Sequence, residues 1–330
     1  MKILLLQPPF PKNDKYPPVG LAYIAAVLIK NNYQTQILDM PAYGFETFTD
    51  IRKYIDEVKP DVIGLTFFTC QFETAKELAA DIKTYSKKII VVAGGIHPSI
   101  LPEQTIKEIT DIDFVIYGEG EYSFLNFLNS FNSEKFEPDF IKNLVFRKPD
   151  GSIKKNICMP LIENLDELPF PAWELLPIEK YSIALPVNRY ERLSNEGLVI
   201  LSSRGCPYNC IFCNSNAVFG DSYRTRSAEN VIEEIKYLIK KFGINQFDFL
   251  DETMTINIKR VESFCDLIDL NGLKIFWSAN ARVNTITENM IKRMKESGCC
   301  RIDFGIESGS DKVLKTIKKN ITVKKIKEAF

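Results

Sequence analysis

The sequence predicts an α/β protein of two domains, each built on a parallel sheet. Short apolar segments alternate with amphipathic segments along most of the chain, which is the pattern of parallel strands covered by helices. The length of 330 residues corresponds to two domains at about 150 residues each. The apolar fraction of 45% is sufficient for two buried cores.

The first domain is predicted over residues 1–135. Its strands are the apolar runs at 2–6, 35–39, 61–68, 88–95 and 114–121. Helical patterns separate them, over 21–32, 46–58, 72–86, 102–109 and 122–131. Five βα units in this order predict a doubly wound, flavodoxin-like (Rossmann-type) sheet, in which ligands bind beyond the carboxyl ends of the strands.

Residues 136–192 are predicted to form a linker with a small hairpin over 143–158. Pro149, Asp150 and Gly151 give the hairpin a clear turn signal. Further along, helix formation is interrupted by Pro169, Pro171, Pro177 and Pro186.

A second βα series is predicted over residues 193–330. Its strands are expected at 197–205, 247–252, 274–281 and 300–308. The helices between and after them are expected at 227–243, 258–269, 287–297 and 311–320, with Ser227 and Gly243 as start and stop signals of the first. Polar residues at the strand ends fit a TIM-barrel-like (β/α) domain. A full barrel needs eight such units in about 200 residues or more, so we expect this barrel to be truncated after four, with an open edge at its fourth strand.

Composition excludes several classes of function. The 42 basic and 43 acidic residues give a net charge of −1, whereas nucleic-acid-binding proteins usually show a strong basic bias. No apolar run approaches the roughly 20 residues that cross a bilayer, and the run after Met1 is too short for a signal peptide. We therefore expect a cytoplasmic protein without nucleic-acid or membrane partners.

Three of the eight cysteines lie close together, in the segment SSRGCPYNCIFCNSN. Cys206, Cys210 and Cys213 follow a predicted strand at C-x3-C-x2-C spacing. Without an export signal, clustered thiols indicate metal or redox chemistry rather than disulfides. Three thiolates on one loop can bind three irons of a cubane cluster and leave the fourth iron open, whereas zinc needs a fourth Cys or His nearby. The alternative is three unrelated buried thiols.

The spacing, its place after a strand, and Phe212 before the last cysteine resemble the radical S-adenosylmethionine (SAM) superfamily. The resemblance continues through FLDETMT and ANARVNTITENMIKRMKESGCCRIDFGIESGSDKVL. Upstream, PPVGLAYIAA, GGIHPS, YGEGE and LDELPFPAWELL resemble the branch with an N-terminal cobalamin-binding domain. The match covers nearly the whole chain and implies a [4Fe–4S] cluster, SAM and cobalamin as cofactors.

The resemblance also implies roles for residues at the strand ends of the second domain. Cys206, Cys210 and Cys213 would bind the cluster. The remaining positions, expected to contact SAM, are Asp251 and Glu252 at its amino group, Asn280 and Arg282 at its ribose and carboxylate, and Glu307 and Ser308 over the same mouth. The alternative for each of these six is a capping or loop role.

In the first domain the resemblance implies a cobalamin site at the strand ends. The corrin and its tail would be lined by Thr66, Thr69, Gly94, Gly95, Gly118, Glu119 and Gly120. The first loop lacks the D-x-H-x-x-G motif that supplies a lower axial histidine, which implies a base-off cobalamin. His97 is expected to contact a cofactor edge or cap the next helix, with axial ligation as the alternative. Such a domain can also lack a corrinoid.

The function implied is reductive cleavage of SAM to a 5′-deoxyadenosyl radical. Cobalamin would transfer a methyl group to an unactivated carbon or phosphorus of a small-molecule substrate, and a flavodoxin or ferredoxin would donate the electron. Ring formation or rearrangement is an alternative reaction, and a methylthiotransferase is another. The last alternative is that the chain is not an enzyme. It would then be a noncatalytic cobalamin or iron–sulfur protein, or an inactive fragment.

Overall fold

A computed structural model describes residues 1–10, 16–181, 183 and 197–330. They form two compact units, which we describe separately. One consists of Met1–Ile162 and Leu168–Lys180, and the other of Glu163–Glu167 and Tyr181–Phe330. The predicted break at Pro186 and the predicted boundary at residue 192 lie outside the described residues.

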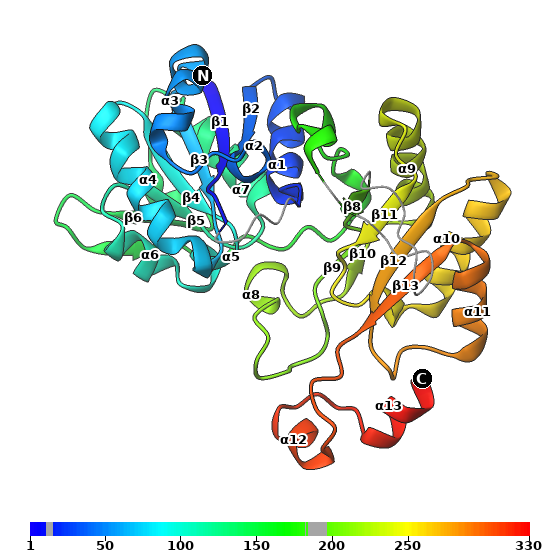
Figure 1. Cartoon of the computed structure of the whole chain (residues 1–330). Coiled ribbons are helices and arrows are strands. Elements are labelled where there is room, and N and C mark those ends of the chain that lie inside the picture. Colours follow the sequence, from blue (N-terminus) through cyan, green and yellow to red (C-terminus); the bar gives the residue numbers. More distant parts are fainter. Residues whose placement is uncertain (11–15, 182, 184–196) are drawn as a thin grey trace. The chain divides into compact units, whose positions relative to one another are not determined.

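The first unit is a seven-stranded sheet in the order β2-β1-β3-β4-β5-β6-β7. Five strands run parallel (Figure 1): β1 (Lys2–Gln7), β2 (Gln34–Asp39), β3 (Val62–Thr66), β4 (Ile90–Gly94) and β5 (Phe114–Ile116). The order 2-1-3-4-5 is that of flavodoxin-like sheets, whose switch point lies between β1 and β3. The predicted fold class of this part is confirmed.

Helices cover both faces of this sheet because its strands are apolar on both faces. Leu4 and Leu6 pack in a core with α3 (Phe48–Val58), α4 (Phe72–Tyr85) and α6 (Pro102–Glu108). The alternate residue Leu5 points to the other face, toward Phe124 of α7 (Gly120–Phe131), which packs beside α1 (Val19–Lys30). The remaining short helices are α2 (Met40–Tyr43) and α5 (Ile96–Ile100).

The predicted hairpin is present, but it does not stand in a separate linker. Its strands β6 (Leu144–Arg147) and β7 (Ile153–Lys155) continue the sheet, with β6 antiparallel to β5. The reason is burial: Leu144, Val145 and Phe146 are at most 4% exposed and complete the core of the first unit. One-turn 3-10 helices lie at Pro138–Phe140, Leu165–Glu167, Trp173–Leu175 and Ile178–Lys180.

The second unit contains a four-stranded parallel sheet in the order β13-β12-β11-β8. The strands are β8 (Leu198–Ile200), β11 (Gln246–Phe249), β12 (Phe276–Ala281) and β13 (Cys299–Phe304). Each strand pairs with the next parallel one in the chain, as in a (β/α) barrel. The predicted class is confirmed here too. A small antiparallel pair, β9 (Ser203–Arg204) and β10 (Arg224–Thr225), follows β8.

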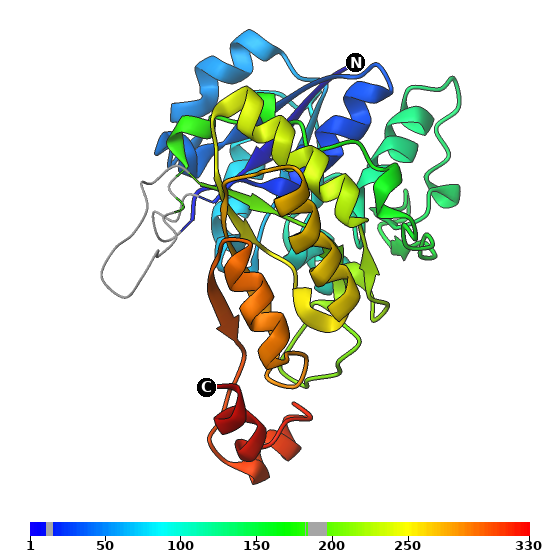
Figure 2. The same cartoon turned by 90° about the vertical axis from the view of Figure 1, so that its right-hand side faces the viewer.

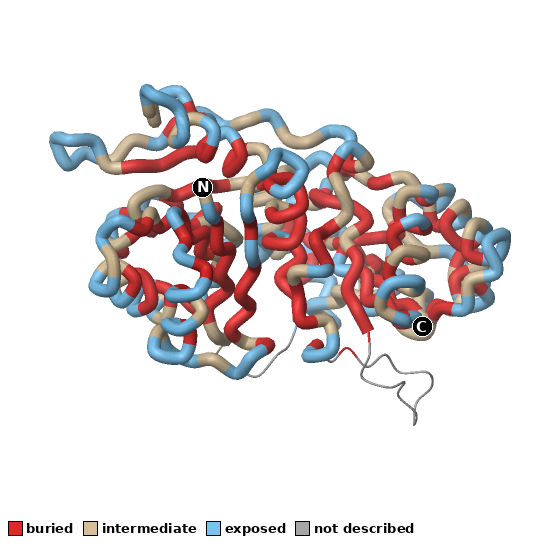
Figure 3. Tube along the Cα trace, turned by 90° about the horizontal axis from the view of Figure 1, so that it is seen from above, coloured by how far each residue is buried: buried red, intermediate tan, exposed pale blue. Residues whose placement is uncertain are grey.

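Three helices cover one face of this sheet (Figure 2): α9 (Ala228–Phe242), α10 (Ile258–Leu270) and α11 (Glu288–Glu296). Ser227 caps α9 by accepting a hydrogen bond from the Asn230 amide at 3.1 Å, and Gly243 ends it in a left-handed conformation. Trp277 is fully buried in edge-on contact with Phe249 and Phe264. Figure 3 shows that buried segments run through the interior of each unit, while exposed segments lie mostly at its periphery.

The remaining elements of this unit are short. They are α8 (Asn216–Phe219), α12 (Asp311–Thr316), α13 (Val323–Ala329) and the 3-10 turn Met254–Ile256. The first unit has a further 3-10 turn at Thr69–Gln71. Among the described residues we find no helix with the length and apolarity needed to cross a bilayer.

Several strands are shorter than predicted, and two of them end shortly before a left-handed residue. The strand expected at 114–121 ends at Ile116, because Gly118 has a φ of +75° and α7 begins at Gly120. The strand expected at 300–308 ends at Phe304, and Glu307 in the loop that follows has a φ of +66°. Left-handed residues do not continue a ladder, so both segments become loops at the strand ends.

Candidate functional site

The cysteine loop begins where β9 ends, at Gly205. This residue has a φ of +80°, and a Cβ placed on it would lie 2.2 Å from the carbonyl oxygen of Ser222. Only glycine fits such a turn. Cys206 and Cys210 are buried, Cys213 is exposed, and all three are free thiols. The loop therefore offers three sulfurs on a tight backbone.

The loop is tied to distant parts of the same unit. The amide of Ile211 donates to the carbonyl of Ile317 at 3.2 Å. Arg282 Nη1 lies 3.6 Å from the Sγ of Cys210, and its guanidinium carbon lies 3.8 Å from the centroid of the Tyr208 ring. Burial raises the pKa of the Cys206 thiol, and the nearby Arg282 acts in the opposite direction.

The donor chemistry of the loop, three cysteine sulfurs, is that of an iron–sulfur cluster. No three Cys, His, Asp or Glu side chains of the described chain come close enough together to share one ion. A cubane does not require this, because each thiolate binds a different iron. Soft thiolate donors are also the ligands that iron–sulfur clusters use.

Asp251 and Glu252 follow β11, and the structure gives them different surroundings. Asp251 is fully buried and accepts hydrogen bonds from the Ser202 amide at 2.7 Å, the Ser202 hydroxyl at 2.5 Å and the Ser203 hydroxyl at 2.7 Å. Both of its oxygens are therefore engaged in joining the end of β11 to the end of β8.

Glu252, in contrast, has a buried Oε2 without a hydrogen-bond partner in the described structure. Burial raises the pKa of its carboxyl to about 7, with Asp251 adding to the rise and Arg204 and Arg224 opposing it. A buried carboxylate oxygen without a partner is costly. A cationic group such as an ammonium would satisfy it, so this residue fits the SAM amino group.

Asn280 and Arg282 lie at the end of β12, next to β11. Asn280 Nδ2 donates to the backbone carbonyl of Asp251 at 3.1 Å. Arg282 is 5% exposed and also donates to the carbonyl oxygen of Lys319. In this structure Arg282 thus contacts the cysteine loop and the segment after α12. Its predicted contact with SAM stays a prediction.

Glu307 and Ser308 lie in the loop after β13. Glu307 Oε1 forms an ion pair with Lys319 Nζ at 2.9 Å, and that lysine side chain is 8% exposed. The Ser308 hydroxyl accepts from the amide of Ser310 at 3.2 Å, which is a loop role. Lys319 was not predicted as part of the site, and it lies in a lysine-rich stretch where the sequence does not distinguish it from its neighbours.

In the first unit, the predicted cobalamin residues come from the ends of neighbouring strands. Thr66 and Gly94 are paired at the ends of β3 and β4. Gly95 follows with a φ of +91°, and a Cβ on it would lie 2.3 Å from the Thr66 hydroxyl. This close approach of backbone to side chain leaves room only for glycine at that position.

His97 is held beside Thr69. The Thr69 hydroxyl and His97 Nδ1 are 3.0 Å apart, and the ring packs against Phe67 and Phe72. Its Nε2 is buried and has no partner in the described structure. Burial lowers the pKa of His97, which favours the neutral ring at pH 7. An unpartnered buried nitrogen fits a polar group of a cofactor.

The loop after β5 holds Gly118, Glu119 and Gly120. The Gly118 amide donates to the Ser99 hydroxyl at 3.0 Å. Glu119 Oε2 accepts from the amide of Ile162 at 2.8 Å, so it fixes a later part of the first unit. A Cβ on Gly120 would lie 2.9 Å from Ile24, which explains a glycine at the start of α7.

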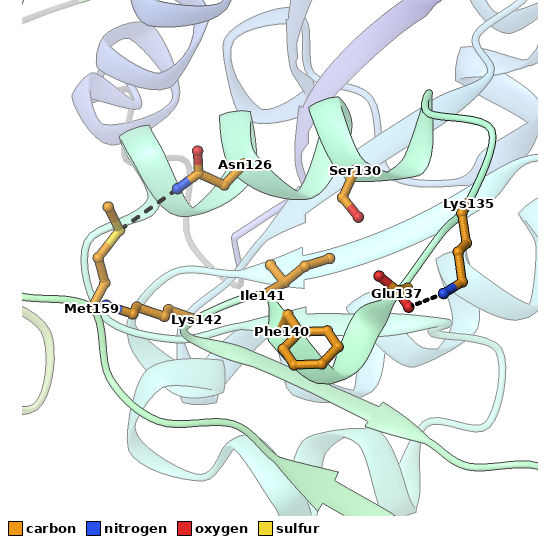
Figure 4. A pocket seen from close by; sticks show the side chains of 8 residues that line it. All are labelled: Asn126, Ser130, Lys135, Glu137, Phe140, Ile141, Lys142 and Met159. Atoms are coloured by element: carbon orange, nitrogen blue, oxygen red, sulfur yellow. Dashed lines mark hydrogen bonds and ion pairs between the residues drawn. The ribbon is translucent and has the colours of Figure 1, made fainter.

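A pocket in the first unit lies apart from all predicted site residues (Figure 4). Asn126 and Ser130 of α7 line one side, and Phe140 and Met159 line the other. Its one ion pair joins Lys135 and Glu137 at 2.5 Å. We assign it no role in the candidate site.

Two family models match the chain, one in each of the two units. The B12-binding domain family matches residues 13–128, and the Radical SAM superfamily matches residues 200–330. The chain is 39% identical over 329 residues to the uncharacterized methyltransferase PH0819 of Pyrococcus horikoshii, covering 98% of this chain and 69% of that protein.

Two further proteins also match nearly the whole of this chain. The anaerobic magnesium-protoporphyrin IX monomethyl ester cyclase of Rubrivivax gelatinosus is 30% identical, covering 100% of this chain and 60% of the enzyme. The cobalamin-dependent SAM radical enzyme OxsB, solved with aqua-cobalamin and SAM, superimposes with a TM-score of 0.85 at 22% identity. That likeness covers 99% of this chain and 47% of OxsB. The chain thus spans between about half and two thirds of these proteins.

Proposed function

Because the chain belongs to the radical SAM family that carries an N-terminal cobalamin-binding domain, we propose that it binds and reductively cleaves SAM. Family membership implies a [4Fe–4S] cluster, SAM and cobalamin as cofactors. The observation that carries the proposal is the loop with three free thiols, two of them buried, together with Glu252, whose buried Oε2 has no partner in the described structure.

Each part of the site has a distinct task in this proposal. Cys206, Cys210 and Cys213 bind three irons, and the fourth iron is left for SAM. When bound, the cluster supplies the electron that cleaves SAM to a 5′-deoxyadenosyl radical, and cobalamin carries the methyl group. Glu252 binds the ammonium of SAM through a charge-assisted hydrogen bond. Asp251 keeps the ends of β8 and β11 together, so that Glu252 keeps a fixed position relative to the cysteine loop.

The remaining strand-end residues support the same ligands in the proposal. Asn280 fixes the turn that carries Asp251 and Glu252. Glu307 and Ser308 hold the loop after β13 in place through their contacts with Lys319 and Ser310. On the first unit, His97 binds a polar edge of cobalamin through Nε2. The other residues proposed to line that cofactor are Thr66, Thr69, Gly94, Gly95, Gly118, Glu119 and Gly120.

We propose methyl transfer to an unactivated carbon or phosphorus of a small molecule as the overall reaction. The support is the 39% identity to a protein named as a methyltransferase. Ring formation is the second candidate, because the chain is also 30% identical to a cyclase. A flavodoxin or ferredoxin is the proposed electron donor, and the cytoplasm the proposed location.

Anaerobic reconstitution tests this proposal. Iron, sulfide and hydroxocobalamin are added to the chain, and 5′-deoxyadenosine and S-adenosylhomocysteine are measured after addition of SAM and reductant. We expect 5′-deoxyadenosine from any radical reaction and S-adenosylhomocysteine from methyl transfer. The first without the second favours ring formation. A chain that retains iron and forms neither product contradicts the proposal.

A pair of cysteine variants makes the test specific. Cys210→Ala removes a proposed ligand, so we expect it to hold less iron than the roughly four atoms of a cubane. Cys265→Ala removes a buried thiol of α10 that lies outside the loop and is expected to keep the full iron content. Equal iron loss in both variants contradicts the assignment.

A further inference from the structure

Arg282 is a buried cation whose contacts converge on the cysteine loop. It is 5% exposed, its Nη1 donates to Cys210 Sγ at 3.6 Å, and its guanidinium stacks 3.8 Å from the Tyr208 centroid. Nη2 donates to the carbonyl of Lys319. A planar guanidinium can make all these contacts at once, which an ammonium cannot.

The charge of Arg282 is not neutralised by an ion pair within the described part of the chain. Among the residues that the structure describes, no Asp or Glu forms an ion pair with it, and its remaining side-chain partner is the neutral amide of Asn284 at 3.4 Å. Taking an ion out of water is costly unless an opposite charge lies nearby. The sulfur of Cys210 is the contact that can supply a negative charge.

A second buried cation near the loop is already neutralised. Lys319 Nζ lies 5.5 Å from the centroid of Phe212 and pairs with Glu307 at 2.9 Å. Two residues before Lys319, the carbonyl oxygen of Ile317 accepts a hydrogen bond from the Ile211 amide at 3.2 Å. Two parts of the described chain therefore hold the loop in place, and Arg282 brings to it a positive charge that no ion pair within the described residues neutralises.

We propose that Arg282 is a positioning residue that orients Cys210 and sets the reduction potential of the cluster. The inference rests on the proposed function, since it requires the three cysteines to bind that cluster. Reduction transfers one electron from a low-potential donor to the cluster and breaks no bond, so the site becomes more negative by one charge. A fixed cation and an N–H donor at a ligating sulfur favour the reduced state.

The test is a reductive titration of the reconstituted chain with dithionite and viologen mediators, followed by electron paramagnetic resonance. Arg282→Gln removes the charge, and we expect the equilibrium constant for reduction to fall tenfold or more, which is 59 mV for one electron. The matched control is Arg293→Gln. Arg293 pairs with Asp266 and Asp269 at 2.9 and 2.8 Å, away from the loop, and its loss should change the constant less than twofold.

Glu307→Gln tests the same electrostatics with Arg282 in place. It removes the charge that balances Lys319, so the potential should rise rather than fall. If Arg282→Gln does not retain a cluster, this second variant decides the question: a rise supports the inference and an unchanged potential overturns it. An unchanged potential in both fully loaded variants also overturns it. A wild-type chain that binds no cluster overturns the proposed function instead.

Discussion

Asp251 and Glu252 are adjacent in the chain and opposite in their surroundings. Asp251 accepts three hydrogen bonds from Ser202 and Ser203, whereas Glu252 has a buried Oε2 with no partner in the described structure. One carboxylate is therefore committed to the fold, and the other is available to a ligand. We therefore expect Asp251 to affect the stability of the chain and Glu252 to affect the binding of SAM. Single substitutions can test each expectation.

Asp251→Ala is expected to lower the free energy of unfolding by about 3 kcal/mol, because it leaves the buried Ser202 amide without an acceptor and removes two hydroxyl hydrogen bonds. Chemical denaturation of the apo chain measures the effect. Asp266→Ala, at an exposed ion pair with Arg293, should cost less than about 1 kcal/mol. Equal stabilities for the two variants would contradict the structural role of Asp251.

Glu252→Gln is expected to weaken SAM binding to the cluster-loaded chain at pH 8 about tenfold or more, because a charge-assisted hydrogen bond to the ammonium is lost. Isothermal titration calorimetry measures the dissociation constant. Glu296→Gln, on the exposed side of α11, serves as the control and should bind SAM as the wild type does. An unchanged dissociation constant for Glu252→Gln would remove this residue from the SAM site.

The pH dependence of SAM binding follows from the raised pKa of Glu252. Burial raises the pKa of this carboxyl to about 7, so the free protein carries a proton there below pH 7. An ammonium stabilises the ionised form and lowers that pKa, so SAM binding must release the proton. We expect affinity to fall as the pH drops from 7 to 6, with proton release detected by calorimetry in two buffers. A wild-type profile as flat as that of Glu252→Gln over this range would refute the explanation.

His97→Ala is expected to weaken cobalamin binding between about twofold and tenfold, the value of one hydrogen bond. The absorption spectrum of bound cobalamin should stay unchanged, because Nε2 is proposed to contact an edge and not the cobalt. Titration with hydroxocobalamin followed by absorbance gives both quantities. A changed spectrum together with a large loss of affinity would instead identify His97 as an axial ligand.

Local sequence signals were enough to predict much of this structure. The apolar run at 2–6 became β1, Ser227 and Gly243 delimit α9, and the cysteine spacing identified the loop, since each of these depends on residues near in sequence. The turn residues predicted the hairpin itself, but not that β6 joins the first sheet, because pairing with β5 is a long-range property.

The surroundings of the loop could not be predicted for the same reason. Arg282 meets Cys210 across 72 residues, and Lys319 meets Glu307 across a left-handed turn. No periodicity encodes such contacts. The family resemblance implied one shared role for Asp251 and Glu252, since only burial and hydrogen bonding distinguish the two carboxylates.

The central claim is that the cysteine loop holds a cluster whose open iron lies within reach of SAM bound at Glu252. Electron paramagnetic resonance of the reduced, iron-loaded chain, recorded before and after SAM is added, tests this directly. We predict a cluster signal whose g values shift on addition of SAM in the wild type, and the same signal without a shift at equal SAM concentration in Glu252→Gln. A wild-type signal that SAM leaves unchanged would contradict the claim.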